Sequence, residues 1–442
     1  MKRLNPSLVF FIGFALLFSC YYCNAWHLAG SRWFTNFQAD SQELVIYRLM
    51  VSHQQGIFAD YGSLERYRDG YGYSLQALPE YYAGDYRAPL KTYQSQIGIQ
   101  GMCFSLLAAV LPCSNALKIQ LFYILTTICM VITLLFLILW MYHEFGPRAA
   151  VFAFASLLFA PWLIVMSRNL YWVFWIMFLP MMIVLYGVRA EDQTGRYSYY
   201  GQALLIFLTV FLKCSAGYEY LSSVLVASLL PVIYYAMSRR WARRKFLTRV
   251  ALILSCGIAA FLVAVCVQSC QRGLLLHSTW VAGLTHILFD AAKRTYGHPA
   301  DFPPELQASL RASVLIVLKK YFISFMLIYL VALGLFTNLH LRFFRQHTRL
   351  HALCVTCWVS LLAPISWFTL AKGHSYIHTH INFILWYLPC IILIACFLGY
   401  FSQTILQAEH IESCHVPDSR MLKVAPAIAI LLCLLLTCII PR

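Results

Sequence analysis

The sequence predicts an all-α, polytopic transmembrane helix bundle, and three observations carry this prediction. Apolar residues make up 61% of the 442 residues and charged residues only 11%. A soluble domain is typically about 45–50% apolar and roughly 25% charged, so this chain has too little polar surface to cover itself in water. Apolar runs of about twenty residues recur along the chain, the length needed to cross about 30 Å of hydrocarbon. The lipid bilayer is therefore the expected environment.

About eleven crossings (10–13) are expected, packed as a single integral-membrane domain over residues 1–442. Two long polar segments interrupt the apolar runs: a first external loop at 24–117 and a second at 269–320, which is either a lid or only a folded loop. The expected spans are 7–23, 118–141, 149–167, 171–188, 201–217, 220–237, 250–268, 321–339, 352–371, 383–400 and 423–440.

Two segments bound the first loop: an apolar first helix before it and the stretch 97–112 near its end. Lys2 and Arg3 precede an apolar core, a pattern shared by signal peptides and uncleaved first helices, and we expect the uncleaved helix. Within 97–112, Gln100 and Gly101 interrupt the apolar run, which is then short for a crossing. This stretch is expected to be an interfacial or re-entrant helix, so that the loop carries helices parallel to the membrane.

Lys and Arg in the short loops fix an orientation. Cytoplasmic loops carry an excess of these residues, and this places the N-terminus and the loops 189–200, 238–245 and 340–351 in the cytoplasm. The same tendency accounts for the formal net charge of +16, and because the basic residues are dispersed over short loops, no nucleic-acid partner is expected.

The sixteen cysteines do not indicate a disulfide framework, because most lie inside apolar segments, where free cysteine behaves as a small hydrophobe. The pair Cys354 and Cys357 has metal-site spacing but no second pair, so core packing is the preferred interpretation. A bridge at Cys214 or Cys270 is left open.

With this orientation, the segments richest in unusual polar residues all face the outside. They are 37–43, 167–172, 213–220 and 371–380. Four segments far apart in sequence are therefore expected to line one cavity.

Asp40 and Glu43 stand at an i, i+3 spacing, which places two carboxylates on one face of a helical turn. One interpretation is a general base with a second carboxylate that positions an acceptor or a metal ion. The other is an N-terminal helix cap, because acidic residues favour a first turn. A divalent cation held by Asp40 and Glu43 stays an option.

Two further segments carry ionisable residues at membrane depth. Lys213 and Glu219 either face a cavity or form a mutual ion pair. Arg168 stands beside Asn169, and an outward-facing arginine can clamp a phosphate with paired donors. Tyr171 and Trp172, which follow, are typical of an interfacial belt.

The densest polar segment runs from Lys372 to His380. It combines Lys372, His374, Tyr376, His378 and His380 between two apolar runs. Phosphate or pyrophosphate binding, metal ligation and ordinary interfacial polarity all fit this composition; for a metal, no nearby carboxylate or cysteine completes an obvious ligand set.

Together these features resemble the GT-C superfamily of integral-membrane glycosyltransferases. Those enzymes have an acidic motif soon after the first helix, membrane-parallel helices in a large first loop, and often a late Lys-x-x-x-Tyr element followed by proline. Here Asp40 to Glu43, the stretch 97–112, and Lys372 to Tyr376 with Pro389 downstream look like those elements. The motif is Asp-x-x-Glu and the histidines are not general to the superfamily, so the resemblance is to a divergent bacterial branch.

The resemblance implies a polyprenyl-phosphate sugar donor, a glycan, lipid or protein acceptor, and an active site on the outer face of the bacterial inner (cytoplasmic) membrane. Asp40 would act as base, and Lys372, His374, His378 and Arg168 would stabilise the phosphate leaving group. Aromatic residues near the mouth of the site would stack on sugar rings: Tyr171, Trp172, Tyr218 and Tyr376. The resemblance does not imply a definite cofactor, and a divalent cation stays an option.

Other functions remain open. A transporter or flippase for lipid-linked sugars would typically show inverted repeats and midplane charges, and no repeat is visible here. An O-antigen-type polymerase or ligase, a membrane acyltransferase with a histidine base, and a purely structural subunit are further alternatives.

Overall fold

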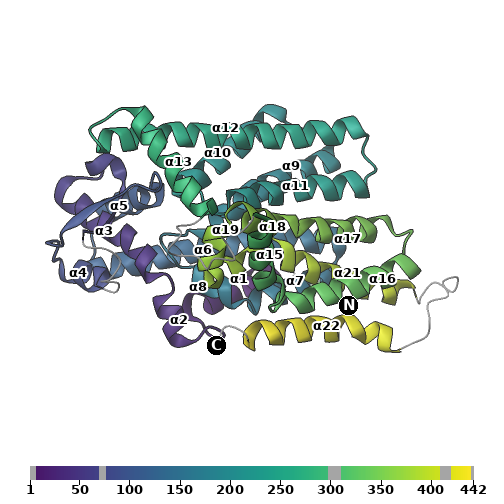
Figure 1. Cartoon of the computed structure of the whole chain (residues 1–442). Helices are drawn as coiled ribbons and strands as arrows, with labels where there is room; N and C mark the ends of the chain where they lie inside the picture. The colour runs from purple at the N-terminus through teal and green to yellow at the C-terminus, as the bar shows by residue number, and fades with distance from the viewer. Residues whose placement is uncertain (1–5, 69–75, 297–309, 409–419, 440–442) are drawn as a thin grey trace.

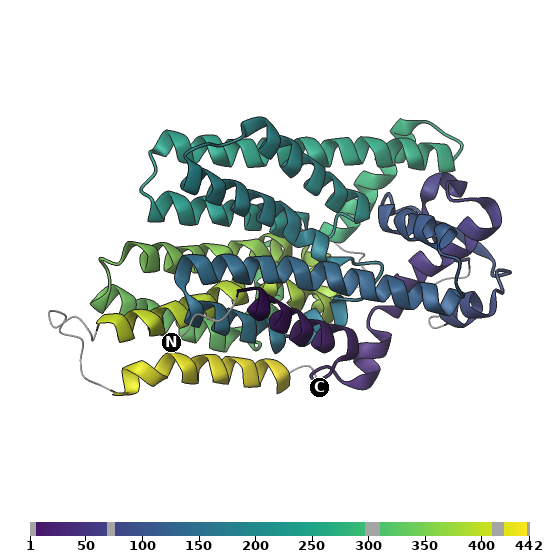
Figure 2. The ribbon, with the colours of Figure 1, turned by 180° about the vertical axis from the view of Figure 1, so that it is seen from behind.

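The computed structural model describes residues 6–68, 76–296, 310–408 and 420–439 and is built almost entirely from helices (Figure 1). The long helices lie roughly parallel, and the first-loop elements α3, α4 and α5 gather at one end of the bundle. Figure 2 shows the same arrangement from behind. The prediction of an all-α multi-pass protein is confirmed at this level.

Eight helical stretches in the described residues are long and apolar enough to cross a membrane, by length and composition. Each overlaps one of the predicted spans, with ends that differ by several residues. They are α6 (Asn115–Phe145), η3 with α9 (Phe174–Phe178, Leu179–Thr194), α10 (Tyr199–Ala216), α11 (Leu221–Ser238), α12 (Arg243–Leu275), α16 (Met326–Phe343), α17 with α18 (Thr348–Ser360, Leu362–Leu370), and α20, η5 and α21 (Thr379–Asn382, Phe383–Tyr387, Cys390–Ala408).

Three predicted spans are not among these eight stretches, so the count of eleven is not confirmed. The predicted spans 7–23 and 423–440 correspond to α1 (Pro6–Cys23) and α22 (Arg420–Ile439). The predicted span 149–167 is divided into α7 (Pro147–Leu158) and α8 (Pro161–Met166). The division has a local cause, because Pro161 cannot donate to the preceding turn and opens α8 at its first position.

The helices α6 and α12 are the two longest of the described helices, and both extend beyond their predicted spans at each end. They have 31 and 33 residues. At 1.5 Å per residue this gives roughly 45–50 Å, against about 30 Å of hydrocarbon. The helix ends that exceed this thickness bind the first loop. Asn115 of α6 donates to the carbonyl of Tyr81, and Gln271 of α12 donates to the carbonyls of Tyr61 and Ile97.

The first loop folds as a small subdomain on those projecting ends. A two-stranded antiparallel sheet that the sequence analysis did not predict pairs Leu64 with Tyr93 and Tyr67 with Leu90. At 12 residues, or roughly 18 Å, α5 is shorter than the hydrocarbon layer; an interfacial position stays a prediction. The elements are α2 (Ser31–Asn36), α3 (Ala39–Gln55), η1 (Ala59–Gly62), β1 (Leu64–Tyr67), α4 (Ala77–Ala83), β2 (Leu90–Tyr93) and α5 (Ile99–Val110).

A buried charge holds this subdomain together. Arg48 of α3 is fully buried and donates to the backbone carbonyls of Ala59, at 2.7 Å, and Ile57. Its nearest carboxylate is Glu65 of β1, 3.9 Å away and also buried. Burial raises the pKa of Glu65 to about 8, with a contribution from the negative charge of Asp60, while Arg48 acts in the opposite direction.

The second loop contains α13 (Trp280–Tyr296) and α15 (Leu310–Phe322); residues 297–309 lie outside the described part. α13 packs on α12 and reaches α19 (Lys372–Ile377), and α15 packs on α18 and α19. Whether this loop acts as a lid stays a prediction.

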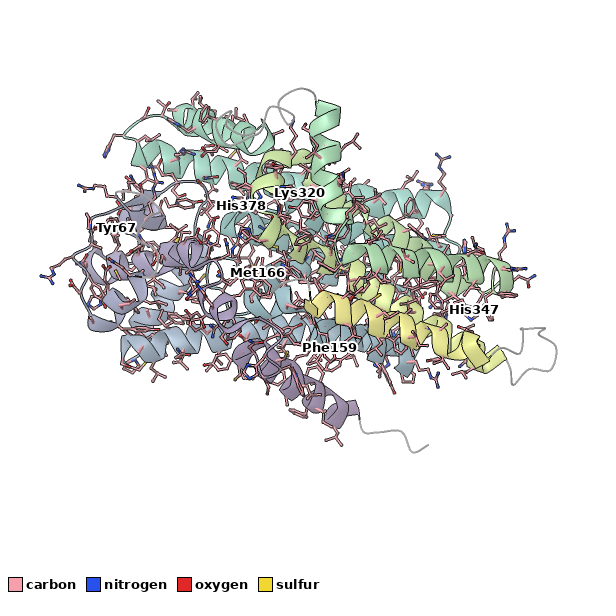
Figure 3. The ribbon with its side chains drawn as sticks, turned by 60° about the horizontal axis from the view of Figure 1, so that its bottom comes forward. Tyr67, Phe159, Met166, Lys320, His347 and His378 are labelled. Carbon is pink, nitrogen blue, oxygen red and sulfur yellow. The ribbon has the colours of Figure 1, made fainter. Side chains whose placement is uncertain are left out.

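The opposite end of the bundle carries the short basic loops at 194–199, 238–243 and 343–348, and we call it the basic end. Arg239 after α11 binds Asp192 of α9 at 2.8 Å and Glu144 of α6 at 3.4 Å. Arg249 of α12 binds Glu191 at 2.9 Å. The loops predicted to share one side of the membrane therefore lie at one end. Figure 3 shows His347 at this end and Tyr67 of the first loop at the other.

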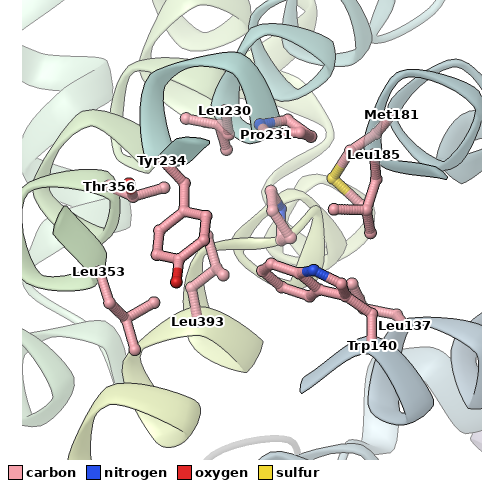
Figure 4. A pocket seen from close by; sticks show the side chains of 11 residues that line it. Leu137, Trp140, Met181, Leu185, Leu230, Pro231, Tyr234, Leu353, Thr356 and Leu393 are labelled. Atoms are coloured by element: carbon pink, nitrogen blue, oxygen red, sulfur yellow. The ribbon is translucent and has the colours of Figure 1, made fainter. Parts of the chain in front are cut away.

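A cavity inside the bundle lies between α6, α9, α11, α17 and α21 (Figure 4). The phenol of Tyr234 points away to Glu144, at 2.7 Å. The other lining side chains are almost all apolar: Leu137, Trp140, Met181, Leu185, Leu230, Pro231, Leu353, Thr356, Pro389 and Leu393. With no charged group in its wall, this cavity is not a candidate for ionic chemistry.

The buried Glu65 predicts a pH dependence of stability. Its pKa is raised on folding, so its contribution is fully present below the ordinary value of 4.5 and is lost as the pH rises through about 8. The melting temperature of the purified protein should therefore fall between pH 5 and pH 9, and this fall should be smaller in Glu65→Gln.

Asp85→Asn is the matched control. The exposed Asp85 has a pKa lowered to about 2 by its hydrogen bonds with Arg87, so its carboxylate stays ionised over this range. Equal pH slopes in wild type and Glu65→Gln would contradict the assignment.

Candidate functional site

The four polar segments singled out in the sequence come together at the end of the bundle opposite the basic end. Each joins two helices or opens one there, because α10 ends at Ala216, α11 begins at Leu221 and α18 ends at Leu370. Hydrogen bonds and ring contacts connect all four segments. Their convergence, which topology alone suggested, is thus present in the structure.

Asn169 connects the second segment to the first. Its side-chain oxygen accepts from the backbone N–H groups of Tyr171 and Trp172, at 3.0 and 3.1 Å. Its side-chain nitrogen donates to the carbonyl of Phe37, at 3.2 Å. Gln42 of α3 accepts from the N–H of Leu170. The entry to α3 is therefore fixed against the 167–172 segment by uncharged amides.

Gln100 connects the second segment to the third. This buried side chain donates to the carbonyl of Tyr171 at 3.2 Å and to that of Ala216 at 3.1 Å. Next to it, Gly98 donates its N–H to the carbonyl of Ser215, at 3.0 Å. The start of α5 therefore connects the 167–172 segment, which precedes α9, to the 213–220 segment, which lies at the end of α10.

Aromatic rings connect the third segment to the fourth. Trp172 stacks on Tyr220 with ring centroids 5.5 Å apart, and Trp367 of α18 meets the other side of Tyr220 edge-on at 5.3 Å. Tyr220 also donates to the side-chain oxygen of Asn382, at 2.7 Å. The Trp367 ring then contacts His374, at 5.6 Å.

The three histidines follow one another along one side of this cluster. His374 and His378 have ring centroids 4.6 Å apart, and His378 and His380 are 6.2 Å apart. Gln38, the residue before α3, lies against His380, with 3.5 Å between its amide nitrogen and the ring nitrogen. The first and fourth segments therefore meet directly at this histidine.

The charges of two carboxylates, Asp40 and Glu219, act on His378. Burial lowers the pKa of His378 below its ordinary value and His380 adds to this, while the negative charges of Asp40 and Glu219 act in the opposite direction. The result is an imidazole that is neutral at pH 7 and has two nearby carboxylates able to stabilise its protonated form.

Asp40 and Glu43 do not share one environment. Asp40 is exposed at the first turn of α3 and acts on the histidines, whereas Glu43 is buried and accepts from the backbone N–H of Ala77 in α4, at 3.3 Å. The carboxylate that joins Asp40 at His378 is Glu219. Asp40 and Glu219 are 179 positions apart in the chain, and no sequence spacing could have paired them.

The cations are distributed around the cluster. Lys213 is buried and donates to the carbonyl of Gly217. Arg168 donates to the carbonyl of Phe34 at 3.2 Å and covers its ring at 3.9 Å. Lys372 is buried and donates to Ser313 of α15, at 2.6 Å. Arg168 thus lies against α2, and Lys372 lies against α15.

Tyr376 contacts a lysine that the sequence analysis had left aside. Lys320 of α15 lies 3.6 Å from the centre of its ring and contacts its carbonyl at 3.5 Å. Among the other contributors, Gln38 and Gln42 were included only as members of the segment 37–43, and Gln100 only as an interruption of an apolar run. The sequence analysis did not single out Gln96, Trp367 or Asn382. What these residues share in the sequence is that each is a polar or aromatic residue at the edge of an apolar run.

No metal centre is evident among the described residues, where no group of three or more His, Cys, Asp and Glu side chains is arranged to hold an ion. Cys214 and Cys270 are free thiols, and Cys354 and Cys357 are buried free thiols of α17.

Unusual backbone conformations gather at the site. Gln38, Val173 and Tyr220 all have positive φ angles, of 51°, 36° and 67°. A non-glycine residue in this region costs on the order of 1–3 kcal/mol and persists only where surrounding contacts impose it. The loops are therefore held in defined shapes.

In comparisons with known proteins, no family model, curated protein or solved structure matched the chain. Function is therefore inferred from the residues and their geometry.

Gly217 gives a direct test of how closely the site is packed. Its φ of 145° and ψ of 152° are accessible almost only to glycine, and an added Cβ would lie 2.5 Å from the Glu219 carboxylate and 2.7 Å from the Gln96 amide. We expect Gly217→Ala to lower the free energy of unfolding by more than the 1–2 kcal/mol of backbone strain alone.

Gly84→Ala is the matched control, because Gly84 also has a positive φ but nothing lies within 4 Å of an added Cβ. The measurement is the melting temperature in one detergent. An equal loss in both variants would show that Glu219 and Gln96 are not packed against Gly217 as described.

Proposed function

We propose that the protein is a glycosyltransferase that moves a sugar from a polyprenyl-phosphate donor to an acceptor on the non-cytoplasmic face of the membrane. The observation that supports this most is that Asp40 follows Gln38, which contacts His380, and that Asp40 and Glu219 both act on His378. The cations Lys372 and Arg168 belong to the same group of converging segments. A base beside a group of cations is what glycosyl transfer from a phosphate requires.

The reaction has one nucleophilic step. The acceptor hydroxyl loses its proton to Asp40, directly or through the neutral His378, and its oxygen forms the new bond to the anomeric carbon. The bond from that carbon to the phosphate oxygen breaks, and polyprenyl phosphate leaves with the electron pair. General base assistance of this kind is typically worth about 10²–10⁴ in rate.

The developing negative charge on the leaving phosphate needs cations in a site with little water. The candidates for this role are Lys372, Lys320, His374 and Arg168. The exposed apolar side chains of α13 and α15, such as Phe289 and Leu315, suit a lipid chain that approaches from the bilayer beside these cations.

Orientation and compartment belong to the proposal. With the basic end in the cytoplasm, the site opens to the periplasm of a bacterial inner membrane. About eleven crossings then follow if α1, α7 with α8, and α22 also pass the bilayer. A divalent cation is not needed for the step as written.

A transporter or flippase for lipid-linked sugars is the second candidate. The buried Lys213 and Lys372 would suit an anion on its way through the membrane. The one-sided position of the histidines and carboxylates favours an active site over an alternating-access path.

Replacement of the proposed base is the primary test. We expect Asp40→Asn to lower transfer from a polyprenyl-phosphate sugar by about 10²–10⁴-fold, because the acceptor keeps its proton. Glu43→Gln is the comparison, since Glu43 lies against α4 and should leave transfer nearly unchanged. The measurement is radiolabelled sugar transfer by purified protein, with melting curves to confirm folding.

Undiminished transfer in Asp40→Asn would assign the base elsewhere. No transfer from a panel of donors, with flipping of a labelled lipid-linked sugar in vesicles, would favour the transporter.

The lowered pKa of His378 predicts an acidic limb in the pH profile. As the pH falls through that pKa, which lies below the ordinary 6.5, the imidazole gains a proton and no longer accepts one. We expect kcat/KM to fall there in wild type, and the His378→Gln variant to be slow and to lack this limb. A limb that persists in His378→Gln would assign it to another group.

A further inference from the structure

The basic end carries more cations than its carboxylates can pair. In the part of the chain that the structure describes, its carboxylates Glu144, Glu191 and Asp192 are all bound to cations. The partners are Arg239, Lys245 and Arg249, whose side chains turn toward the bundle. The acidic residues are therefore already used within the fold.

Three arginines remain on the outside of the α11–α12 connection. Arg240, Arg243 and Arg244 are exposed, and none of them forms an ion pair with a described residue. Together with Trp241 they form a surface that we call the α12 arginine surface. Like charges held this close repel one another unless an anion lies among them.

The position of this surface relative to lipid follows from α12. Within a few residues of Arg244 the helix exposes Leu247, at 49%, and further along Ile258 and Leu262, at 53% and 54%. Such a face belongs against hydrocarbon. Trp241, with Lys245 4.0 Å from the centre of its ring, stands at the level where tryptophan favours the interface. The arginines are thus at headgroup height.

The start of α12 adds to the demand for an anion. Arg243 and Arg244 occupy the first turn, which contains no acidic residue, and Ala242 supplies no side-chain cap. Cations at a helix N-terminus are disfavoured by the helix dipole, and the first N–H groups there have no partner inside the helix. A phosphate beside the arginines would offset both effects.

We propose that the α12 arginine surface binds the phosphate groups of anionic phospholipids in the leaflet at the basic end. The occupant is a lipid because the surface borders an apolar, outward-facing helix, and it is anionic because no carboxylate of the described chain competes for the arginines. This binding is independent of the glycosyltransferase activity proposed above.

The test compares wild type with Arg240→Gln/Arg243→Gln/Arg244→Gln in nanodiscs of mixed phosphatidylglycerol and phosphatidylcholine with matched acyl chains. The measurement is the ratio of the two lipids that copurify with the released protein. An arginine near an anionic surface contributes about 1 kcal/mol, or roughly fivefold. We therefore expect the preference for phosphatidylglycerol to fall by on the order of tenfold or more in the triple variant.

Arg32→Gln/Arg68→Gln/Lys118→Gln is the matched control, because it removes the same net charge at the other end of the bundle. It should keep the wild-type preference. Equal loss in both variants would reduce the effect to net charge, and no loss in either would overturn the proposal.

A second measurement stands even if the triple variant fails to fold. A photoreactive phosphatidylglycerol in wild-type nanodiscs should label peptides that cover residues 239–247, and high salt should weaken the labelling. Labelling confined to other peptides would overturn the proposal. Retention of RNA or an acidic protein with no lipid preference would assign the surface to a different partner.

Discussion

Irregular backbone near a membrane must satisfy its own hydrogen bonds, and in this protein uncharged amide side chains do so. Asn169 ties the 167–172 segment to Phe37, and Gln100 ties it to Ala216. Gln271 holds the first loop through Tyr61 and Ile97. Each amide offers both a donor and an acceptor without the cost of burying a charge. The convergence of the polar segments depends on these few bonds.

The two ends of the molecule differ in how their charged side chains are paired. At the basic end the carboxylates are paired with cations that turn inward, and arginines remain outside. At the loop end, Asp40 and Glu219 act on a histidine, and the cations Lys372 and Arg168 are held by neutral partners, a hydroxyl and a backbone carbonyl. Cations with neutral partners keep their charge available for an anion, whereas those in ion pairs serve the fold.

Much of the fold could be predicted from the sequence, because a run of about twenty apolar residues is a local property that needs no tertiary information. The projection of α6 and α12 was missed, since it depends on where polar residues find partners beyond the bilayer. The division at Pro161 was also missed, although its cause is local. The small sheet of the first loop gave too short a pattern to predict.

The site was predictable only at the level of segments. Topology placed 37–43, 167–172, 213–220 and 371–380 on one side, but it could not tell which way a side chain turns. Glu43 accepts a hydrogen bond from α4, and Glu219 is the carboxylate that acts on His378 together with Asp40. Asn169 was a candidate, but Gln42 and Gln100 were given no role in the site, because an uncharged amide stands out less in a sequence than a charged side chain.

The length of α12 has a mechanical consequence. One continuous helix of 33 residues begins among the arginines of the basic end and ends at the first loop. There, Gln268 and Gln271 donate hydrogen bonds to backbone carbonyls of the loop. A rod pinned in this way behaves as a lever: any tilt that lets its apolar face match a thinner or thicker bilayer moves the first loop with it. Membrane thickness is thereby a mechanical input to the entry of α3, where Asp40 lies.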